Sequence, residues 1–108
     1  MLSIIIPTLN EEKGIAKTLR SIPEKIRKKS EVIVVDASND STPDIAQSFG
    51  AKVIRAKKKG KGYQMRMAVK ESRGDILIFL DGDGTDPGEF IPAMVKKLEN
   101  SELVLGCR

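Results

Sequence analysis

The chain has 108 residues, of which 40% are hydrophobic and 31% charged, and its net charge is +4. These values suit one globular domain over residues 1–108 and argue against a disordered chain. Histidine is absent and there is one cysteine, which excludes His-based triads, His-ligated metal and an internal disulfide. No apolar stretch is long enough to span a membrane and no secretory signal is evident, so a cytoplasmic location is expected.

The first quarter of the chain predicts a strand and a helix. Leu2–Ile6 is a short apolar run typical of a buried strand, and Pro7 is expected to end it because proline cannot donate to a sheet. Apolar residues at helical spacing then predict a helix over residues 11–22, with Asn10 as its N-cap. Glu24–Ser30 is expected to be a polar connection.

The next stretch predicts a strand, a helix and a strand. Glu31–Val35 forms an apolar run that ends at Asp36. Thr42-Pro43-Asp44 combines a cap, a first-turn proline and a first-turn acid, which indicates a helix start, and Gly50 is the expected stop. Lys52–Ala56 is the third expected strand.

Basic residues gather after this strand, in Lys-Lys-Lys-Gly-Lys-Gly at 57–62. The run is either a solvated loop or a phosphate-facing loop, with glycines for close backbone approach and lysines as point charges. A nucleic-acid partner is not expected, since only Tyr63 is nearby to stack and no binding motif frames the run. A helix is expected from about residue 62 to residue 73, with Gly74 as its stop.

The apolar run Ile76–Leu80 stops at Asp81-Gly82-Asp83 and predicts a strand buried on both faces. Ligands in open α/β sheets sit beyond the carboxyl ends of such strands. The two carboxylates are therefore expected at a ligand-facing edge, where they would hold Mg²⁺ or Mn²⁺ together with a diphosphate. A solvated turn at the strand end is the alternative.

Asp86-Pro87-Gly88-Glu89 predicts the start of a last helix, which runs to about Asn100, and Leu103–Gly106 predicts a last strand. Strands and helices thus alternate along the whole chain. This order predicts a three-layer α/β fold, with a mostly parallel, Rossmann-like sheet and helices on both faces. Acidic side chains after the first, second and fourth strands would then meet at one edge of the sheet.

Five segments spread over nearly the whole chain carry a resemblance to a known family. They are residues 3–12 (SIIIPTLNEE), 34–42 (VVDASNDST), 59–62 (KGKG), 80–83 (LDGD) and 104–108 (VLGCR). In content and spacing they resemble family 2 glycosyltransferases of the GT-A fold, and most of all dolichyl-phosphate mannose or glucose synthases. The resemblance implies a nucleotide-diphosphate-sugar donor, a divalent metal, and an acceptor such as a polyprenyl (dolichyl) phosphate.

The resemblance also implies roles for individual residues. Those expected to bind the nucleotide are Pro7, Leu9, Glu11, Asp36, Lys61 and Gly62. Those expected to bind the metal are Asp81, Asp83 and Thr85, and the two aspartates would also be the catalytic residues. Within this set Asp36 would hydrogen-bond the base, and Glu11 would lie near the ribose or base.

Three departures from the family bear on function. Ala37 follows Asp36 where the family often has a second aspartate, which bears on base selectivity. Thr85 stands where the lipid-phosphate synthases often place glutamine. The acceptor-binding half of the family would lie beyond the last expected strand, so residues 1–108 are expected to form a nucleotide-binding half that is incomplete for turnover alone.

Two other functions fit parts of the sequence. A non-catalytic nucleotide-sugar-binding or assembly module would share every feature above. Residues 79–85 also fit the nucleophile motif of haloacid-dehalogenase-like phosphatases, although the 25 residues after Asp83 are too few for the other elements of that family. A half-fold with an open edge near Leu103–Leu105 favours a homo-oligomer, and the positive charge allows peripheral membrane association.

Overall fold

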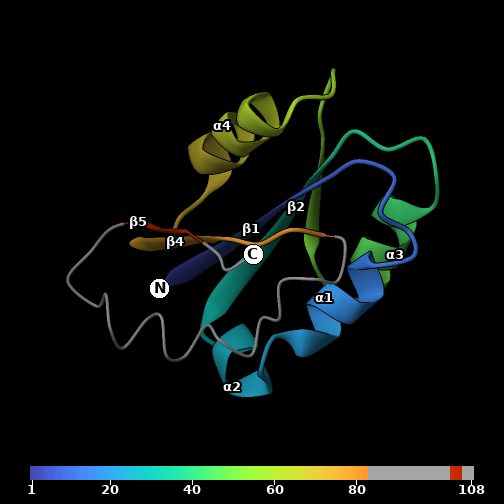
Figure 1. Ribbon diagram of the computed structural model, residues 1–108. Helices are drawn as coiled ribbons and strands as arrows, with labels where there is room; N and C mark the ends of the chain where they lie inside the picture. The colour runs from blue at the N-terminus through green and yellow to red at the C-terminus, as the bar shows by residue number, and fades with distance from the viewer. Residues whose placement is uncertain (83–102, 106–108) are drawn as a thin grey trace.

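The computed structural model describes residues 1–82 and 103–105, which form a parallel sheet flanked by helices (Figure 1). The elements are β1 (Leu2–Thr8), α1 (Ile15–Ser21), α2 (Glu24–Arg27), β2 (Ser30–Asp36), α3 (Thr42–Ser48), β3 (Lys52–Arg55), α4 (Lys61–Glu71), β4 (Ile76–Phe79) and β5 (Leu103–Leu105). Within this part of the chain the sheet has five strands in the order β3-β2-β1-β4-β5, and every neighbouring pair is parallel. The predicted α/β fold class is confirmed.

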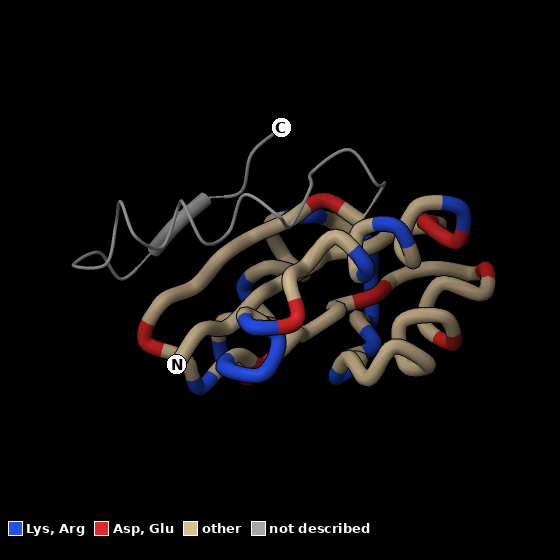
Figure 2. The backbone as a smooth tube through the Cα atoms, turned by 90° about the horizontal axis from the view of Figure 1, so that it is seen from below, with Lys and Arg blue, Asp and Glu red and all other residues tan. Residues whose placement is uncertain are grey.

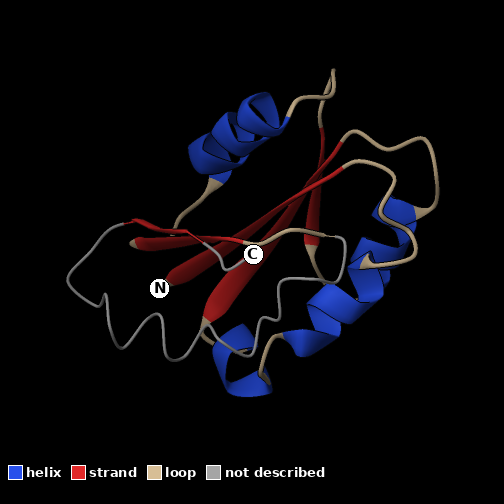
Figure 3. Cartoon of the chain, in the orientation of Figure 1, coloured by secondary structure: helices blue, strands red, loops and turns tan. Residues whose placement is uncertain are grey.

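The helices cover both faces of the sheet (Figure 3), with α4 on one face and α1, α2 and α3 on the other. Side chains alternate along each strand, so β1 and β2 contribute to two separate cores. Ile4 and Ile6 pack with α1 and α3, whereas Ile5 and Val35 pack under α4 around Ala68. The sheet is therefore fully buried at its centre, which fixes the positions of the strand ends.

The strand order also locates a reversal in the path of the chain. From β1 the chain moves outward through β2 to β3, and it then returns to the other side of β1 as β4. In open α/β sheets ligands bind outside the carboxyl ends of the strands at such a switch point. Here the switch point lies between β1 and β4.

The prediction that Pro7 ends the first strand is wrong, because β1 continues through Thr8 and pairs Pro7 with Val35. The carbonyl of Ile5 accepts the Leu80 N–H at 3.0 Å, so Ile5 directs its backbone groups toward β4. Pro7, two residues later, directs its own groups to the same side, but β4 has already ended at Phe79. Its missing N–H therefore removes no hydrogen bond from the sheet.

The predicted helix over residues 11–22 begins later, at Ile15, with Gly14 and not Asn10 at the N-cap. Asn10 instead has φ 55°, donates its N–H to Ser38 Oγ at 2.7 Å and accepts the Asn39 N–H at 2.9 Å. These bonds to the next loop replace the capping bond. The predicted polar connection contains a short helix, α2, from Glu24 to Arg27.

The third helix begins and ends close to its predicted bounds. Asp40, rather than Thr42, supplies the side-chain oxygen at its start, and accepts the Thr42 N–H at 2.9 Å. At the other end Gly50 has φ +84°, so the predicted stop is confirmed. β3 occupies most of the predicted third strand.

Gly74 is not the residue that ends the fourth helix, because α4 ends at Glu71 with Ser72 as C-cap. A Cβ at Gly74 would lie 2.5 Å from Ser3 Oγ and 2.7 Å from the Ser3 nitrogen, so glycine is needed there for contact with β1. The predicted helix from Asp86 to Asn100 lies outside the described residues. In residues 1–82 and 103–105, no helix is long and apolar enough to cross a membrane.

Candidate functional site

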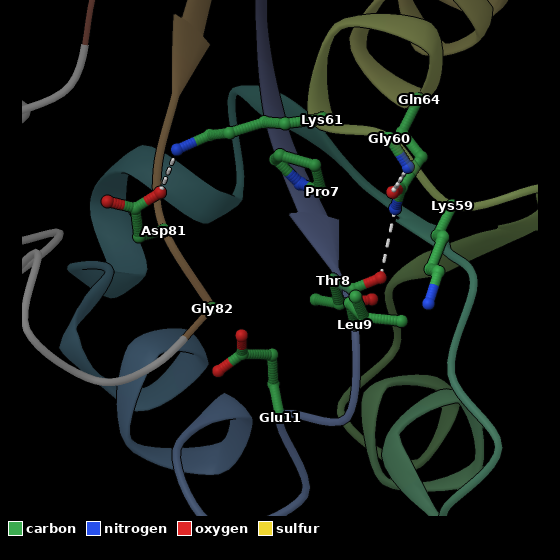
Figure 4. Close-up of a pocket in the computed structure, with 10 residues that line it drawn as sticks. All are labelled: Pro7, Thr8, Leu9, Glu11, Lys59, Gly60, Lys61, Gln64, Asp81 and Gly82. Carbon is green, nitrogen blue, oxygen red and sulfur yellow. Dashed lines mark hydrogen bonds and ion pairs between the residues drawn. The ribbon is translucent and has the colours of Figure 1, made fainter.

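A pocket of about 530 Å³ opens at the switch point, beyond the carboxyl ends of β1 and β4 (Figure 4). Three segments that are distant in sequence form its walls. They are the end of β1 with its loop (Pro7, Thr8, Leu9 and Glu11), the start of α4 (Lys59, Gly60, Lys61 and Gln64) and the residues after β4 (Asp81 and Gly82). The pocket is thus built where the topology favours a ligand.

An ion pair joins two walls of this pocket. Lys61 Nζ donates to Asp81 Oδ1 at 2.5 Å, and the side chains are 46% and 24% exposed. Figure 4 shows the Lys61 side chain reaching from the start of α4 to the end of β4. Thr18 Oγ1 donates to the backbone carbonyl of Asp81 at 3.2 Å, which helps to fix the backbone there. A cationic and an anionic group therefore face the same hollow.

Glu11 brings a second carboxylate to the pocket. Its side chain points toward Gly82 (Figure 4), while its backbone N–H donates to Thr42 Oγ1 at 2.9 Å. A Cβ at Gly82 would lie 2.8 Å from Thr8 Cγ2 and 3.4 Å from Ile6 Cγ2. The segment after β4 therefore contacts β1 directly, and this contact requires a glycine.

Gln64 fastens the start of α4 to the sheet. It is 2% exposed, and its side-chain nitrogen donates to the carbonyls of Thr8 at 2.9 Å and Val35 at 2.8 Å. Its Oε1 accepts the Gly60 N–H at 3.1 Å. This residue was not predicted from the sequence. The available signal was its position four residues before Ala68, on the buried face of the helix, where a polar side chain needs partners.

Asp36 is fully buried and does not line the pocket. Its Oδ1 accepts hydrogen bonds from Thr8 Oγ1 and Ser38 Oγ, both at 2.6 Å. Its Oδ2 accepts the Ser38 N–H at 3.0 Å and an ion-paired N–H of Arg55. Arg55 also donates to the Ser38 carbonyl at 3.0 Å. Asp36 therefore holds the loop after β2 against the ends of β1 and β3.

The loops after β1 and β2 are joined by further hydrogen bonds. Asp40 accepts bonds from Thr42 and, at 3.3 Å, from the Glu12 N–H. Desolvation raises the pKa of the Asp40 carboxyl, but the bonds from Thr42 and from the Glu12 N–H outweigh it and hold the pKa below its usual value. This network fixes the backbone that carries Leu9 and Glu11 into the pocket.

A second hollow of about 350 Å³ lies beside the pocket and shares Leu9 and Lys59 with it. Its walls also include Arg55 and Lys57, together with the backbone turns after β2 and β3. Lys58, another of its lining residues, has its ammonium 4.8 Å from the centre of the Tyr63 ring. The basic run after β3 thus borders both hollows, and further Lys and Arg residues are spread along the rest of the described chain (Figure 2).

The structure brings five of the predicted site residues to the pocket, namely Pro7, Leu9, Glu11, Lys61 and Asp81. Gly62 is exposed in the first turn of α4 and does not line it. Asp83 and Thr85 lie outside the described residues. Lys59, Gly60, Thr8 and Gln64 were not predicted individually as pocket residues, although Lys59 and Gly60 belong to the run interpreted as phosphate-facing.

The donor set of the pocket suits a hard cation that arrives with a diphosphate. Within the described ranges no three His, Cys, Asp or Glu residues form a metal site by themselves. The carboxylates of Asp81 and Glu11 line the same pocket, however. Mg²⁺ is commonly held by only one or two protein carboxylates together with phosphate oxygens.

Comparison with known proteins gives a family match over nearly the whole chain, because residues 3–108 match a family model described as "Glycosyl transferase family 2". The hexosyltransferase Agl6 of low-salt glycan biosynthesis in Haloferax volcanii is 37% identical over 99% of the chain. The dolichyl-phosphate hexose transferase of the same organism is 32% identical over 99% of the chain. The alignments span 27% and 47% of these two relatives.

Among solved structures, glucosyl-3-phosphoglycerate synthase from Mycobacterium tuberculosis superposes with a TM-score of 0.78 and 29% identity. The match covers 91% of this chain and 39% of that one. That structure contains Mn²⁺, uridine diphosphate and glucosyl-3-phosphoglycerate.

Proposed function

The chain belongs to glycosyl transferase family 2, and we propose that its pocket binds the diphosphate of a nucleotide-sugar donor together with Mg²⁺ or Mn²⁺. The sugar would pass to an acceptor such as a polyprenyl phosphate. One observation carries the proposal: Lys61 and Asp81 meet at 2.5 Å inside a pocket at the switch point. A diphosphate needs cationic partners, and a cation needs carboxylate oxygens.

The residues of the pocket divide into two chemical groups. Lys59 and Lys61 offer ammonium groups to phosphate oxygens, and Asp81 offers an oxygen to the cation. When bound, the cation would act as a Lewis acid that stabilises the negative charge developing on the departing nucleoside diphosphate. Glu11 would accept hydrogen bonds from ribose hydroxyls or the base, and Pro7 and Leu9 would supply apolar contact beside it.

Other predicted residues keep their roles as proposals. Asp83 and Thr85 would complete the set of metal ligands, with the two aspartates as catalytic residues, and Gly62 would lie near the nucleotide. Each oxygen of Asp36 already accepts two hydrogen bonds. Asp36 would therefore contribute to binding of the nucleotide base through the residues that it positions, Ser38 and Arg55.

The acceptor and the complete reaction are proposed by comparison with longer relatives. The chain spans less than half of the length of each of these two. The name of one of them, dolichyl-phosphate hexose transferase, supports a polyprenyl phosphate acceptor. A non-catalytic sugar-nucleotide-binding module is the second candidate. A cytoplasmic location, peripheral membrane contact and self-association stay predictions, and light scattering would test the last of them.

The experiment that tests donor binding uses calorimetry with UDP and GDP, each with and without Mn²⁺, on the wild-type chain and on Asp81→Asn. We expect binding that depends on Mn²⁺ in the wild type and is lost in Asp81→Asn. Asp75→Asn removes a carboxylate at the opposite edge of the sheet, whose side chain is 91% exposed, and should bind as the wild type does. Equal binding by wild type and Asp81→Asn would contradict the proposal.

Turnover separates an enzyme from a binding module. Transfer of sugar from UDP- or GDP-hexoses to a short polyprenyl phosphate, followed by thin-layer chromatography, measures it directly. Binding with no transfer would favour the non-catalytic module.

A further inference from the structure

The Lys61–Asp81 ion pair differs from the Arg55–Asp36 ion pair, which lies at the same edge of the sheet. In the Arg55–Asp36 pair the carboxylate is fully buried and accepts three further hydrogen bonds. Asp81, by contrast, keeps 24% of its side chain exposed, and both Asp81 and Lys61 line the pocket. The carboxylate of Asp81 is therefore accessible to a ligand, and the carboxylate of Asp36 is not.

The ammonium and a divalent cation compete for one oxygen. Lys61 Nζ lies 2.5 Å from Asp81 Oδ1. A cation coordinated by that oxygen would stand about 2.0–2.6 Å from it, so two positive centres would share one small space. Coulomb repulsion at this separation is strong in a partly desolvated pocket. A cation on Oδ1 would therefore displace Lys61, and a cation on the second oxygen of the same carboxylate would still repel the ammonium.

The backbone of Lys61 stays in place during this exchange. It opens α4, and the preceding Gly60 donates its N–H to the buried Gln64 side chain at 3.1 Å. The lysine stem has four flexible carbons, so the ammonium can swing while its Cα remains anchored. Its new positions lie within the pocket, where the diphosphate of a donor would sit.

We propose that Lys61 is an internal counter-ion that pairs with Asp81 before a divalent cation binds. When the cation binds, the side chain of Lys61 moves and its ammonium pairs with the donor diphosphate. This inference rests on the proposed function and deepens it, because it makes cation and nucleotide binding cooperative. When the cation binds alone, the displaced ammonium loses its bond to Asp81 and gains no phosphate oxygen in return. With the nucleotide present, the displaced ammonium gains a phosphate oxygen, and each ligand therefore strengthens the binding of the other.

Lys61→Met tests the proposal because it keeps the length of the side chain and removes the charge. The probe is Mn²⁺ alone, followed by electron paramagnetic resonance of the free ion. We expect Lys61→Met to bind Mn²⁺ roughly two- to fivefold more tightly than the wild type, which is the range for removal of a partly exposed ion pair. UDP and GDP in saturating Mn²⁺ should bind about tenfold more weakly, because a charge-assisted bond to phosphate is lost.

Lys70→Met is the matched control, since it removes a lysine from the last turn of the same helix, where it is exposed and lines neither hollow. Both affinities should equal those of the wild type. Lys61→Gln serves as a second variant if Lys61→Met unfolds, and circular dichroism checks each protein.

Two outcomes overturn the proposal in distinguishable ways. If the wild type binds Mn²⁺ with a nucleotide, but Lys61→Met binds Mn²⁺ alone no more tightly, Lys61 is not a competitor and this inference fails by itself. If the wild type binds neither UDP nor GDP in the presence of Mn²⁺, the proposed function fails and the inference fails with it.

Discussion

Two aspartates lie at the carboxyl ends of the strands on either side of β1, and their surroundings differ. Asp36, the last residue of β2, is fully buried, and four donors from Thr8, Ser38 and Arg55 occupy its oxygens. Asp81, after β4, is partly exposed in a pocket and pairs with Lys61 on a flexible stem. The same residue type at equivalent strand ends is thus structural on one side of β1 and accessible to ligands on the other.

The neighbouring segments explain the difference. On the β2 side, a loop of short polar residues folds back, and its backbone and hydroxyl groups saturate the carboxylate. On the β4 side, Gly82 lies so close to Thr8 that an added Cβ would be 2.8 Å from Thr8 Cγ2, and the side chain of Asp81 lines the pocket. The comparison predicts that substitutions on the β2 side affect stability first, whereas those on the β4 side affect binding first.

Asp36→Ala should have the largest effect on stability. It leaves the hydroxyl groups of Thr8 and Ser38 and one face of Arg55 without their partner, at a cost of about 3 kcal/mol in the free energy of unfolding. Urea denaturation measures it. Asp75→Asn, at an exposed carboxylate, should cost less than about 0.5 kcal/mol. Similar losses in both variants would mean that the Asp36 network contributes little.

Gly82→Ala tests the close contact on the β4 side. Its Cβ would meet Thr8 Cγ2 at 2.8 Å, and Thr8 cannot move freely because its hydroxyl is bonded to Asp36. We expect the free energy of unfolding to fall by about 1–3 kcal/mol, as for overpacking. Binding of Mn²⁺ and nucleotide should also weaken.

Gly62→Ala is the control, because an added Cβ has room there and should not lower the stability. Its Cβ would meet only Arg66 Nη1, at 3.5 Å, in the first turn of α4. Alanine there should be neutral or stabilising by up to about 1 kcal/mol. A loss of stability in Gly62→Ala as large as that in Gly82→Ala would contradict the packing argument.

Gln64→Met should have an intermediate effect, and it should lower both the stability of the fold and the affinity for nucleotide. The carbonyls of Thr8 and Val35 and the Gly60 N–H would lose the buried amide, at a cost of about 1–2 kcal/mol. Because Gln64 anchors the backbone before Lys61, nucleotide affinity should also fall in the folded variant. Calorimetry below the melting temperature separates the two effects, and unchanged affinity would argue against a positioning role.

The smallest expected effect is on the pH dependence of stability in the acid range. At Glu31, burial raises the pKa, but hydrogen bonds from the Arg73 N–H and Ser3 outweigh it, so this pKa, like that of Asp40, lies below its ordinary value. Such carboxylates contribute stability that is present above the ordinary values of 4.5 and 3.8 and is lost as the pH falls through the lower folded values.

Asp40→Asn and Glu31→Gln should each flatten the fall in urea midpoint as the pH is lowered from about 5 to about 3. An unchanged slope in both Asp40→Asn and Glu31→Gln would contradict this assignment.

The sequence predicted the alternating fold well, because apolar runs such as Ile76–Leu80 leave no other way to bury their side chains. It placed Glu11 and Asp81 at one edge of the sheet through the ends of the strands, and the family resemblance added Pro7, Leu9 and Lys61 to the residues that line the pocket. Local rules failed where tertiary contacts compete with them. Asn10 has the chemistry of an N-cap, but bonds to the loop after β2 hold it in another conformation.

The difference between Asp36 and Asp81 was not visible in the sequence. It depends on Arg55 reaching across from β3 and on Lys61 reaching across from α4, and neither distance follows from spacing along the chain. Gly74 failed as a predicted helix stop for a similar reason, since its role depends on a strand 71 residues away in sequence.

The most direct test of the central claim is a crystal structure with Mn²⁺ and UDP or GDP, with the metal located by its anomalous scattering. We expect an anomalous peak within coordination distance of an Asp81 oxygen, about 2.0–2.6 Å, with the diphosphate beside it and the Lys61 ammonium moved onto a phosphate. A peak in the second hollow, or a nucleotide bound away from the switch point while Lys61 still pairs with Asp81, would contradict it.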